Sequence, residues 1–186
     1  MTAQELLWEI ALDRHGYVTT ADARAVGVAP HTLKLLAQRG KLLREGHGLY
    51  RFERFPASAA DEYQQAVLWT GQPDAALSHQ TALDVLDLCD VNPDRIHVTV
   101  PATARVRRSG GDQIELHHQT LQPAAIGWWE GVRCVTEETA IDQTITGGTT
   151  PLHLIRQAID TARSRGRINQ EAAADFTSRM EFSLDE

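Results

Sequence analysis

The chain has 186 residues, of which 42% are hydrophobic and 23% are charged, a composition typical of a folded protein. No run of about 18 apolar residues predicts a membrane span, and the N-terminus carries acidic residues where a signal peptide would carry basic ones. We therefore expect a cytoplasmic protein without a membrane segment. The two cysteines, Cys89 and Cys134, form no CxxC pair and are expected to be free, partly buried thiols.

The net charge of −7 is unevenly distributed along the chain. Residues 1–55 hold eight Lys or Arg against six Asp or Glu, which leaves a net charge of −9 for residues 56–186. Both lysines of the protein, Lys34 and Lys41, lie in the N-terminal part. Because charges beyond about a Debye length are screened, a local basic patch attracts nucleic acid even when the whole protein is acidic.

The first 55 residues predict three helices followed by a β-hairpin. Helices are expected over residues 4–15, 19–26 and 31–39. Thr19 and Asp22 form a capping-box pattern at the second helix, and Pro30 takes the first position of the third. Two short apolar runs around the Gly-rich residues 45–48 predict the hairpin. This order of elements is typical of a winged helix-turn-helix.

A linker is expected at residues 56–60, followed by a larger domain that mixes helices and strands. Helices are expected over residues 61–70, 78–88, 137–144, 151–163 and 168–180, and strands over 95–100, 113–118 and 132–135. The predicted fold class is α+β. It combines a winged helix-turn-helix domain over residues 1–55 with a mixed α/β domain, which has a small sheet and C-terminal helices, over residues 61–186.

The predicted helix over residues 31–39 has an apolar side and a polar side. Leu33 and Leu36 lie on the side expected to pack against the first two helices. The opposite side has residue types that read DNA, since Gln pairs with adenine, Arg or Lys with guanine, and Leu contacts the thymine methyl group. The expected DNA-contacting residues on or beside this helix are His31, Thr32, Lys34, Leu35, Gln38, Arg39 and Lys41. An ordinary amphipathic helix with a solvated polar side is the alternative.

The hairpin and a later loop add further basic side chains. Arg44, His47 and Arg51 are expected to contact phosphates or the minor groove from the hairpin. A second basic run in the larger domain is either a further phosphate contact, a docking loop for another protein or a solvated loop. It consists of Arg105, Arg107 and Arg108. Winged helices also serve as protein-interaction modules, so that function is the alternative to DNA binding.

The sequence lacks motifs for catalysis or cofactor binding. His117-His118 has no third ligand at metal spacing, and no GxxxxGK, GxGxxG or GxSxG motif is present. Ser78-His79 is interpreted as a helix cap beside a surface imidazole. No lysine follows Lys41, which excludes a catalytic lysine in the second domain. We therefore expect no catalytic residues, no metal and no cofactor. A nuclease or transferase in the acidic second domain is the alternative.

Four segments together resemble the AbiEi-type antitoxins of bacterial toxin–antitoxin operons. GYVTTADARAVGVAPHTLKLLAQRGKLLREGHGLYRF is similar to the winged-helix domain of that family. LSHQTALDVLDL, RIHVTVP and VRCVTEETAIDQTI follow in the order of the family's C-terminal domain, so the resemblance covers roughly residues 5–146. The chain departs from the family at Ala29, where a Ser-like cap is common, and is short after the last segment.

The resemblance implies an autorepressor that also acts as an antitoxin. The implied partners are operator DNA and a nucleotidyltransferase-like toxin. Because one chain presents one recognition helix and repressor sites usually have two half-sites, we also expect inverted-repeat half-sites and self-association on DNA, as a stable dimer or as two cooperating monomers. A stand-alone transcriptional regulator is the alternative that the same architecture implies.

Overall fold

In the computed structural model, which describes residues 1–182, the chain forms two compact units. The first comprises residues 1–73 together with two short segments from later in the chain, 105–111 and 130–132. The remaining described residues form the second unit. The fold is α+β, as expected. Among the described residues, no helix is long and apolar enough to cross a membrane.

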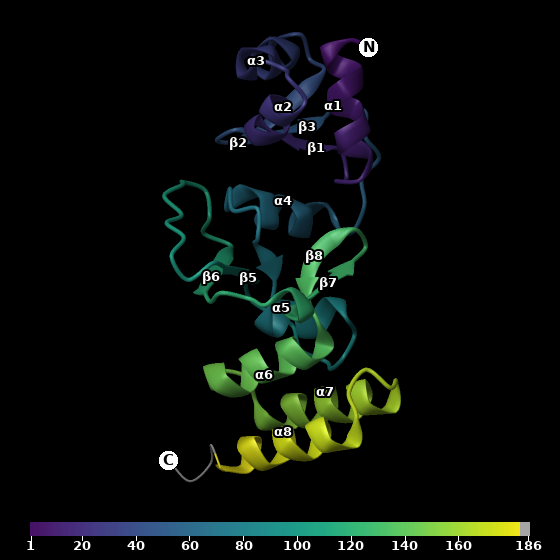
Figure 1. Ribbon diagram of the computed structural model, residues 1–186, viewed down its shortest axis with the longest axis vertical. Coiled ribbons are helices and arrows are strands. Elements are labelled where there is room, and N and C mark those ends of the chain that lie inside the picture. The colour runs from purple at the N-terminus through teal and green to yellow at the C-terminus, as the bar shows by residue number, and fades with distance from the viewer. Residues whose placement is uncertain (183–186) are drawn as a thin grey trace. The chain divides into compact units, whose positions relative to one another are not determined.

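The first unit consists of four helices and a three-stranded antiparallel sheet (Figure 1). The helices are α1 (Ala3–Leu12), α2 (Thr20–Ala25), α3 (Pro30–Gln38) and α4 (Asp61–Trp69). The strands, in sheet order, are β1 (Tyr17–Thr19), β3 (Leu49–Phe52) and β2 (Leu42–Gly46). The predicted winged helix-turn-helix is thus confirmed. Strand β1 was not predicted, because three residues are too few to show an alternating pattern.

Local interactions set the start of α2 and α3. The Asp22 amide donates to Thr19 Oγ1 over 3.1 Å and the Thr19 amide donates to Asp22 Oδ2 over 2.8 Å, which confirms the predicted capping box. The turn before α3 contains Gly27 at a φ of +73°, where a side chain would be strained. Helix α3 follows Ala29, which makes no side-chain capping bond, and begins at Pro30.

One apolar core joins α1, α2, α3 and the sheet. It contains Leu7, Ala11, Val18, Ala23, Val28, Leu33, Leu36, Leu42, Tyr50 and Phe52. The ring of Trp8 packs edge-on against Phe52, with 4.9 Å between the ring centroids. Burial of Leu33 and Leu36 fixes the rotation of α3 about its axis, so its opposite side faces away from the core.

The predicted linker at residues 56–60 lies inside the first unit. An ion pair of 2.7 Å joins Arg51 of β3 to Asp61 of α4, and Ser58 Oγ donates to Asp61 Oδ1 over 2.7 Å. These bonds hold α4 to the sheet. The first compact unit therefore extends to Pro73 and includes α4, which the sequence predicts as part of the second domain. A division of function between residues 1–55 and 61–186 stays a prediction.

The second unit contains a mixed five-stranded sheet followed by helices. The strands, in sheet order, are β6 (Ile114–His118), β5 (Ile96–Val100), β4 (Ala76–Leu77), β8 (Val132–Val135) and β7 (Ile126–Trp129). The helices are α5 (His79–Val85), the 3-10 helix η1 (Pro123–Ala125), α6 (Glu137–Gly147), α7 (Leu152–Ser164) and α8 (Gln170–Phe182). Strand β4 runs antiparallel to β5 and parallel to β8, while β5 and β6 are parallel.

The packing of the second unit follows from its buried helix faces. Helix α5 packs on α6 and β5, and α7 and α8 pack on each other and on α6.

The predicted strands are confirmed as β5, β6 and β8, whereas β4 and β7 were not predicted. Thr136 caps α6 as expected, since its Oγ1 accepts from the Thr139 amide over 3.4 Å. Cys89 and Cys134 are free as expected, and both are buried.

Candidate nucleic-acid interface

The polar side of α3 is exposed and has no partner among the residues that the structure describes. Exposed side chains are those of His31, Lys34, Leu35, Gln38, Arg39 and Lys41, whereas Thr32 is half-buried. Among residues 1–182, none of the polar side chains of this set makes a hydrogen bond or ion pair with another residue. Leu35 is 42% exposed, which leaves apolar surface between the polar groups. These side chains are free to bind a partner outside the protein.

The hairpin of β2 and β3 forms the wing, and it is attached to the start of α2. The Thr20 amide donates to the carbonyl of Gly48 over 2.9 Å. Gly48 has a φ of +68°, and a Cβ there would lie 2.8 Å from Thr20 Oγ1, so only glycine fits this contact. The side chains of Arg44 and His47 are exposed and have no partner elsewhere in the described chain.

Arg51 differs from the other predicted contact residues because its guanidinium is occupied. Besides the ion pair with Asp61, Nη2 donates to the Pro56 carbonyl over 3.0 Å and Nε donates to the His15 carbonyl over 3.1 Å. The side chain is 12% exposed, and its guanidinium carbon lies 5.5 Å from the centroid of the Tyr17 ring. Arg51 therefore holds β3, the following segment and α4 together, and we do not include it in the proposed DNA contact.

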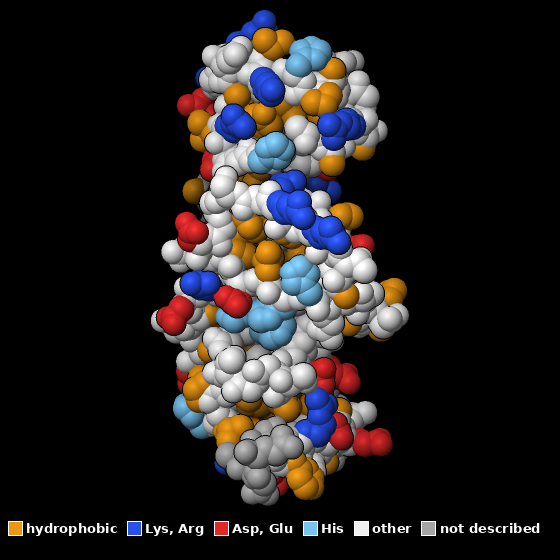
Figure 2. Space-filling view, turned by 90° about the vertical axis from the view of Figure 1, so that its left-hand side faces the viewer, with side chains coloured by type: hydrophobic (Ala, Val, Ile, Leu, Met, Phe, Trp, Pro, Cys, Tyr) orange, Lys and Arg blue, Asp and Glu red, His pale blue; other side chains and the backbone are white. Residues whose placement is uncertain are grey.

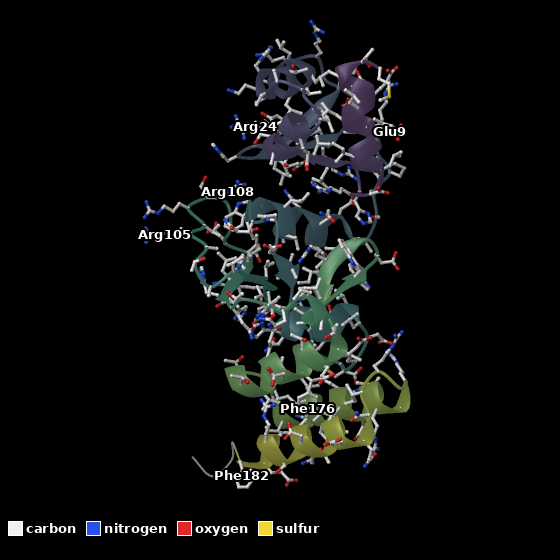
Figure 3. All side chains as sticks on the ribbon, in the orientation of Figure 1. Glu9, Arg24, Arg105, Arg108, Phe176 and Phe182 are labelled. Atoms are coloured by element: carbon white, nitrogen blue, oxygen red, sulfur yellow. The ribbon has the colours of Figure 1, made fainter. Side chains whose placement is uncertain are left out.

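The basic run at Arg105–Arg108 belongs to the first unit. Arg108 Nη1 donates to the carbonyl of His47, at the tip of the wing, over 3.1 Å. Trp69 Nε1, at the end of α4, donates to the carbonyl of Ser109 over 3.0 Å. Arg105 and Arg107 are exposed, and Figure 3 shows Arg105 pointing away from the ribbon. The loop is thus attached to the wing through Arg108 and leaves two arginines free.

The predicted contact residues that are exposed and without a partner in the described chain therefore come from three elements: α3 with the residues just after it, the wing and the loop. Figure 2 shows several Lys and Arg side chains close together on one face of the molecule. Arg24 of α2 is also exposed and was not predicted as a contact, although its position in the last turn of the second helix is readable from the sequence. Charge and exposure fit a phosphate backbone, while the mixed polar and apolar groups of α3 fit base edges.

Three histidines of the second unit form a stacked cluster that the sequence does not predict. His79 stacks on His117 with 3.5 Å between the ring centroids, and His97 Nδ1 lies 2.9 Å from His117 Nε2. Burial, followed by the neighbouring imidazoles, lowers the pKa of His79 to about 3 and that of His97 to about 4. The pairing of β5 with β6 brings His97 and His117 together, which no local pattern indicates.

The expected surface imidazole at His79 is wrong, because its ring is partly buried in this cluster. Ser78 does precede α5, but its hydroxyl makes no capping bond and lies 3.0 Å from His79 Nδ1 instead. His117 is part of the cluster, whereas the neighbouring His118 is exposed. Within residues 1–182, no group of His, Cys, Asp or Glu side chains is arranged to hold a metal ion.

The fold of the first unit defines a winged helix-turn-helix domain. Residues 5–52 match the family model described as "Transcriptional regulator, AbiEi antitoxin". Residues 5–52 thus match the AbiEi antitoxin regulator domain, which confirms the family resemblance over this part of the chain. No curated protein matches the sequence.

Among solved structures, the chain is similar to the crystal structure of the Rv2827c protein from Mycobacterium tuberculosis. The TM-score is 0.54 at 18% sequence identity, and the match covers 98% of this chain and 76% of that chain. At this level of identity the likeness concerns the fold.

Proposed function

We propose that this protein is a sequence-specific DNA-binding autorepressor. Helix α3 enters the major groove, and the wing holds the phosphate backbone through Arg44 and His47. The observation that carries the proposal is the exposed polar side of α3, which lies opposite the buried Leu33 and Leu36 and has no partner within the described residues. The family match of residues 5–52 supports the same function independently of this geometry.

Self-association on DNA is part of the proposal. One chain presents one recognition helix, whereas operators of helix-turn-helix repressors have two half-sites about one helical turn apart. Two copies on an inverted repeat would place one α3 in each half-site.

The decisive experiment compares the wild type with the double variant Lys34→Ala/Gln38→Ala. Fluorescence anisotropy measures the affinity for the DNA upstream of the protein's own gene and for a random duplex of equal length. A bidentate base contact contributes about 1–3 kcal/mol of discrimination, so the variant should lose about tenfold or more of its preference per contact. Circular dichroism should show an unchanged fold, because both side chains are exposed.

The matched control is Arg156→Ala, which removes an exposed arginine of α7 in the second unit. It should bind both duplexes as the wild type does. Undiminished preference for the upstream DNA in the α3 variant would contradict the assignment of α3. Weak binding by the wild type to every duplex, without a steep dependence on salt, would instead support the protein-interaction alternative.

The second part of the proposal is that the chain counteracts a nucleotidyltransferase-like toxin. Outside the loop of residues 105–111, residues 56–186 hold 7 Lys or Arg against 19 Asp or Glu, which disfavours contact with DNA there and supports a role for the second domain toward a protein. The test is growth of cells that express the product of the neighbouring gene with and without this chain. Lys34→Ala/Gln38→Ala should still restore growth if neutralisation is separate from operator binding. Failure of the wild type to restore growth would leave a stand-alone regulator.

A further inference from the structure

The loop of residues 105–111 belongs to the first unit, which carries the proposed DNA-contacting residues, although it comes from the middle of the chain. It groups with residues 1–73 rather than with the strands on either side of it. Arg108 bonds to the backbone of the wing tip at His47, and Trp69 bonds to the backbone of Ser109. These two bonds attach the loop to the wing and to α4.

Two glycines permit this close attachment. A Cβ at Gly71, which has a φ of +67°, would collide with the Arg108 guanidinium. A Cβ at Gly111 would collide with the Trp69 ring. The Arg108 guanidinium therefore lies directly against the backbone of Gly71, and the Trp69 indole lies directly against the backbone of Gly111. The loop is therefore packed against α4 and the wing on both sides of Ser109, rather than merely being close to them.

Only one of the three arginines is used for this attachment. Arg105 and Arg107 are exposed and make no hydrogen bond or ion pair among residues 1–182. No acidic residue occurs between residues 101 and 111. The acidic residue of the wing, Glu45, is half-buried and accepts from Gln65 Nε2 over 3.4 Å. The two free guanidinium groups are thus not neutralised by their own loop.

We propose that Arg105 and Arg107 form a second phosphate-binding element, which contacts the DNA backbone beyond the wing and lengthens the bound site. The Arg108–His47 bond positions this element relative to the wing, so both contact the same duplex. Exposed arginines with free donors fit phosphate oxygens, and a loop without base-reading geometry adds affinity that does not depend on sequence. This inference rests on the proposed DNA binding, and it adds a contact that α3 and the wing do not supply.

The test uses the full chain with Arg105→Ala/Arg107→Ala and the charge-preserving Arg105→Lys/Arg107→Lys. Binding to a long duplex that contains the operator is measured as a function of KCl concentration. Each lost phosphate contact reduces the slope of log affinity against log salt by about 0.9, so the alanine variant should lose about 1.8 for each copy of the chain bound to the duplex. The lysine variant should keep most of the slope, and Arg156→Ala/Arg163→Ala in α7 should keep all of it.

Duplex length provides a second measurement. On a duplex trimmed to the bases covered by α3 and the wing, the alanine variant and the wild type should bind equally, because the flanking phosphates are absent. An unchanged slope on the long duplex would overturn the inference. An unchanged slope together with loss of growth rescue against the neighbouring gene product would also overturn it, and would assign the loop to a protein partner.

The α3 variant and the wild type together separate a wrong loop contact from a wrong assignment of DNA binding. If Lys34→Ala/Gln38→Ala loses operator preference while the loop variant behaves as the wild type, only the loop contact is wrong. If the wild type itself shows no operator preference and no salt dependence, DNA binding as a whole is wrong.

Discussion

The guanidinium of Arg51 lies 2.7 Å from the carboxylate of Asp61, across a segment that the sequence marks as a linker. The two side chains are 12% and 20% exposed, so the pair is largely shielded from water. Arg51 also donates to two backbone carbonyls through Nε and Nη2, so its guanidinium is held in place by three acceptors of the protein itself. The pair thus gives a basic residue of the wing strand a structural role.

Arg51→Ala is therefore expected to destabilise the protein rather than to change DNA contacts directly. Removing one partner of a shielded, hydrogen-bonded ion pair leaves Asp61 uncompensated and should lower the free energy of unfolding by roughly 2 kcal/mol. Urea denaturation measures this loss. Arg54→Ala, at an exposed position two residues beyond β3, is the control and should change the stability by less than about 0.5 kcal/mol. Equal effects of the two substitutions would contradict the role assigned to Arg51.

Ala29→Ser should stabilise the protein. Ala29 occupies the position before α3 in an extended conformation, with φ −65° and ψ 135°, and offers no side-chain acceptor. A serine hydroxyl there would accept from a free amide of the first turn, which contributes about 1 kcal/mol. The midpoint of thermal unfolding should rise accordingly, whereas Ala29→Gly should not raise it. A lower midpoint for the serine variant would show that its hydroxyl does not reach the helix amides.

Arg44→Ala should weaken binding to all DNA sequences to the same extent. Its side chain is exposed on the wing and has no partner in the described part of the chain, so we expect it to contact one phosphate. The slope of log affinity against log salt should fall by about 0.9 for each bound copy of the chain, with the ratio of operator to random binding unchanged. Titrations at three or more salt concentrations measure the slope. A loss confined to the operator would mean that the wing reads bases.

The histidine cluster predicts that stability falls as the solution becomes acidic. His79 and His97 have lowered pKa values in the folded protein, of about 3 and about 4, so they stay neutral where the unfolded chain binds protons below pH 6.5. Protons therefore favour the unfolded state, and the free energy of unfolding should decrease from pH 6.5 downward through these values. Urea denaturation between pH 4.5 and pH 7.5 follows this decrease.

His79→Asn is the informative variant for the cluster. His79 has a φ of +50°, and asparagine tolerates this backbone conformation better than most residues while lacking a group that titrates in this range. The decrease of stability with acid should be shallower in this variant than in the wild type. The comparison at pH 7.5 is the control, because His79 is neutral there in both states. Equal slopes in the acid range would remove His79 as a cause of acid sensitivity.

The sequence by itself determined the first three helices, the wing and the residues that α3 presents, but not strand β1. The Thr19–Asp22 capping box, Pro30 and the spacing of Leu33 and Leu36 all act within a few residues along the chain. Helix starts, turns and amphipathic faces depend on such short spacings, so they are legible without knowledge of the fold. The wing followed from the same kind of signal at its glycines.

Only the tertiary structure decided which of the basic residues are free. Arg51 and Arg44 look alike in the sequence, yet Arg51 is bonded to Asp61 while Arg44 is exposed. The attachment of Arg108 to His47 joins residues 61 positions apart. The reason is physical: a charge is available for a ligand only if folding brings no acceptor to it, and the acceptors come from distant parts of the chain. The local pattern therefore specifies which groups exist, and the packing of the chain specifies which of them remain available.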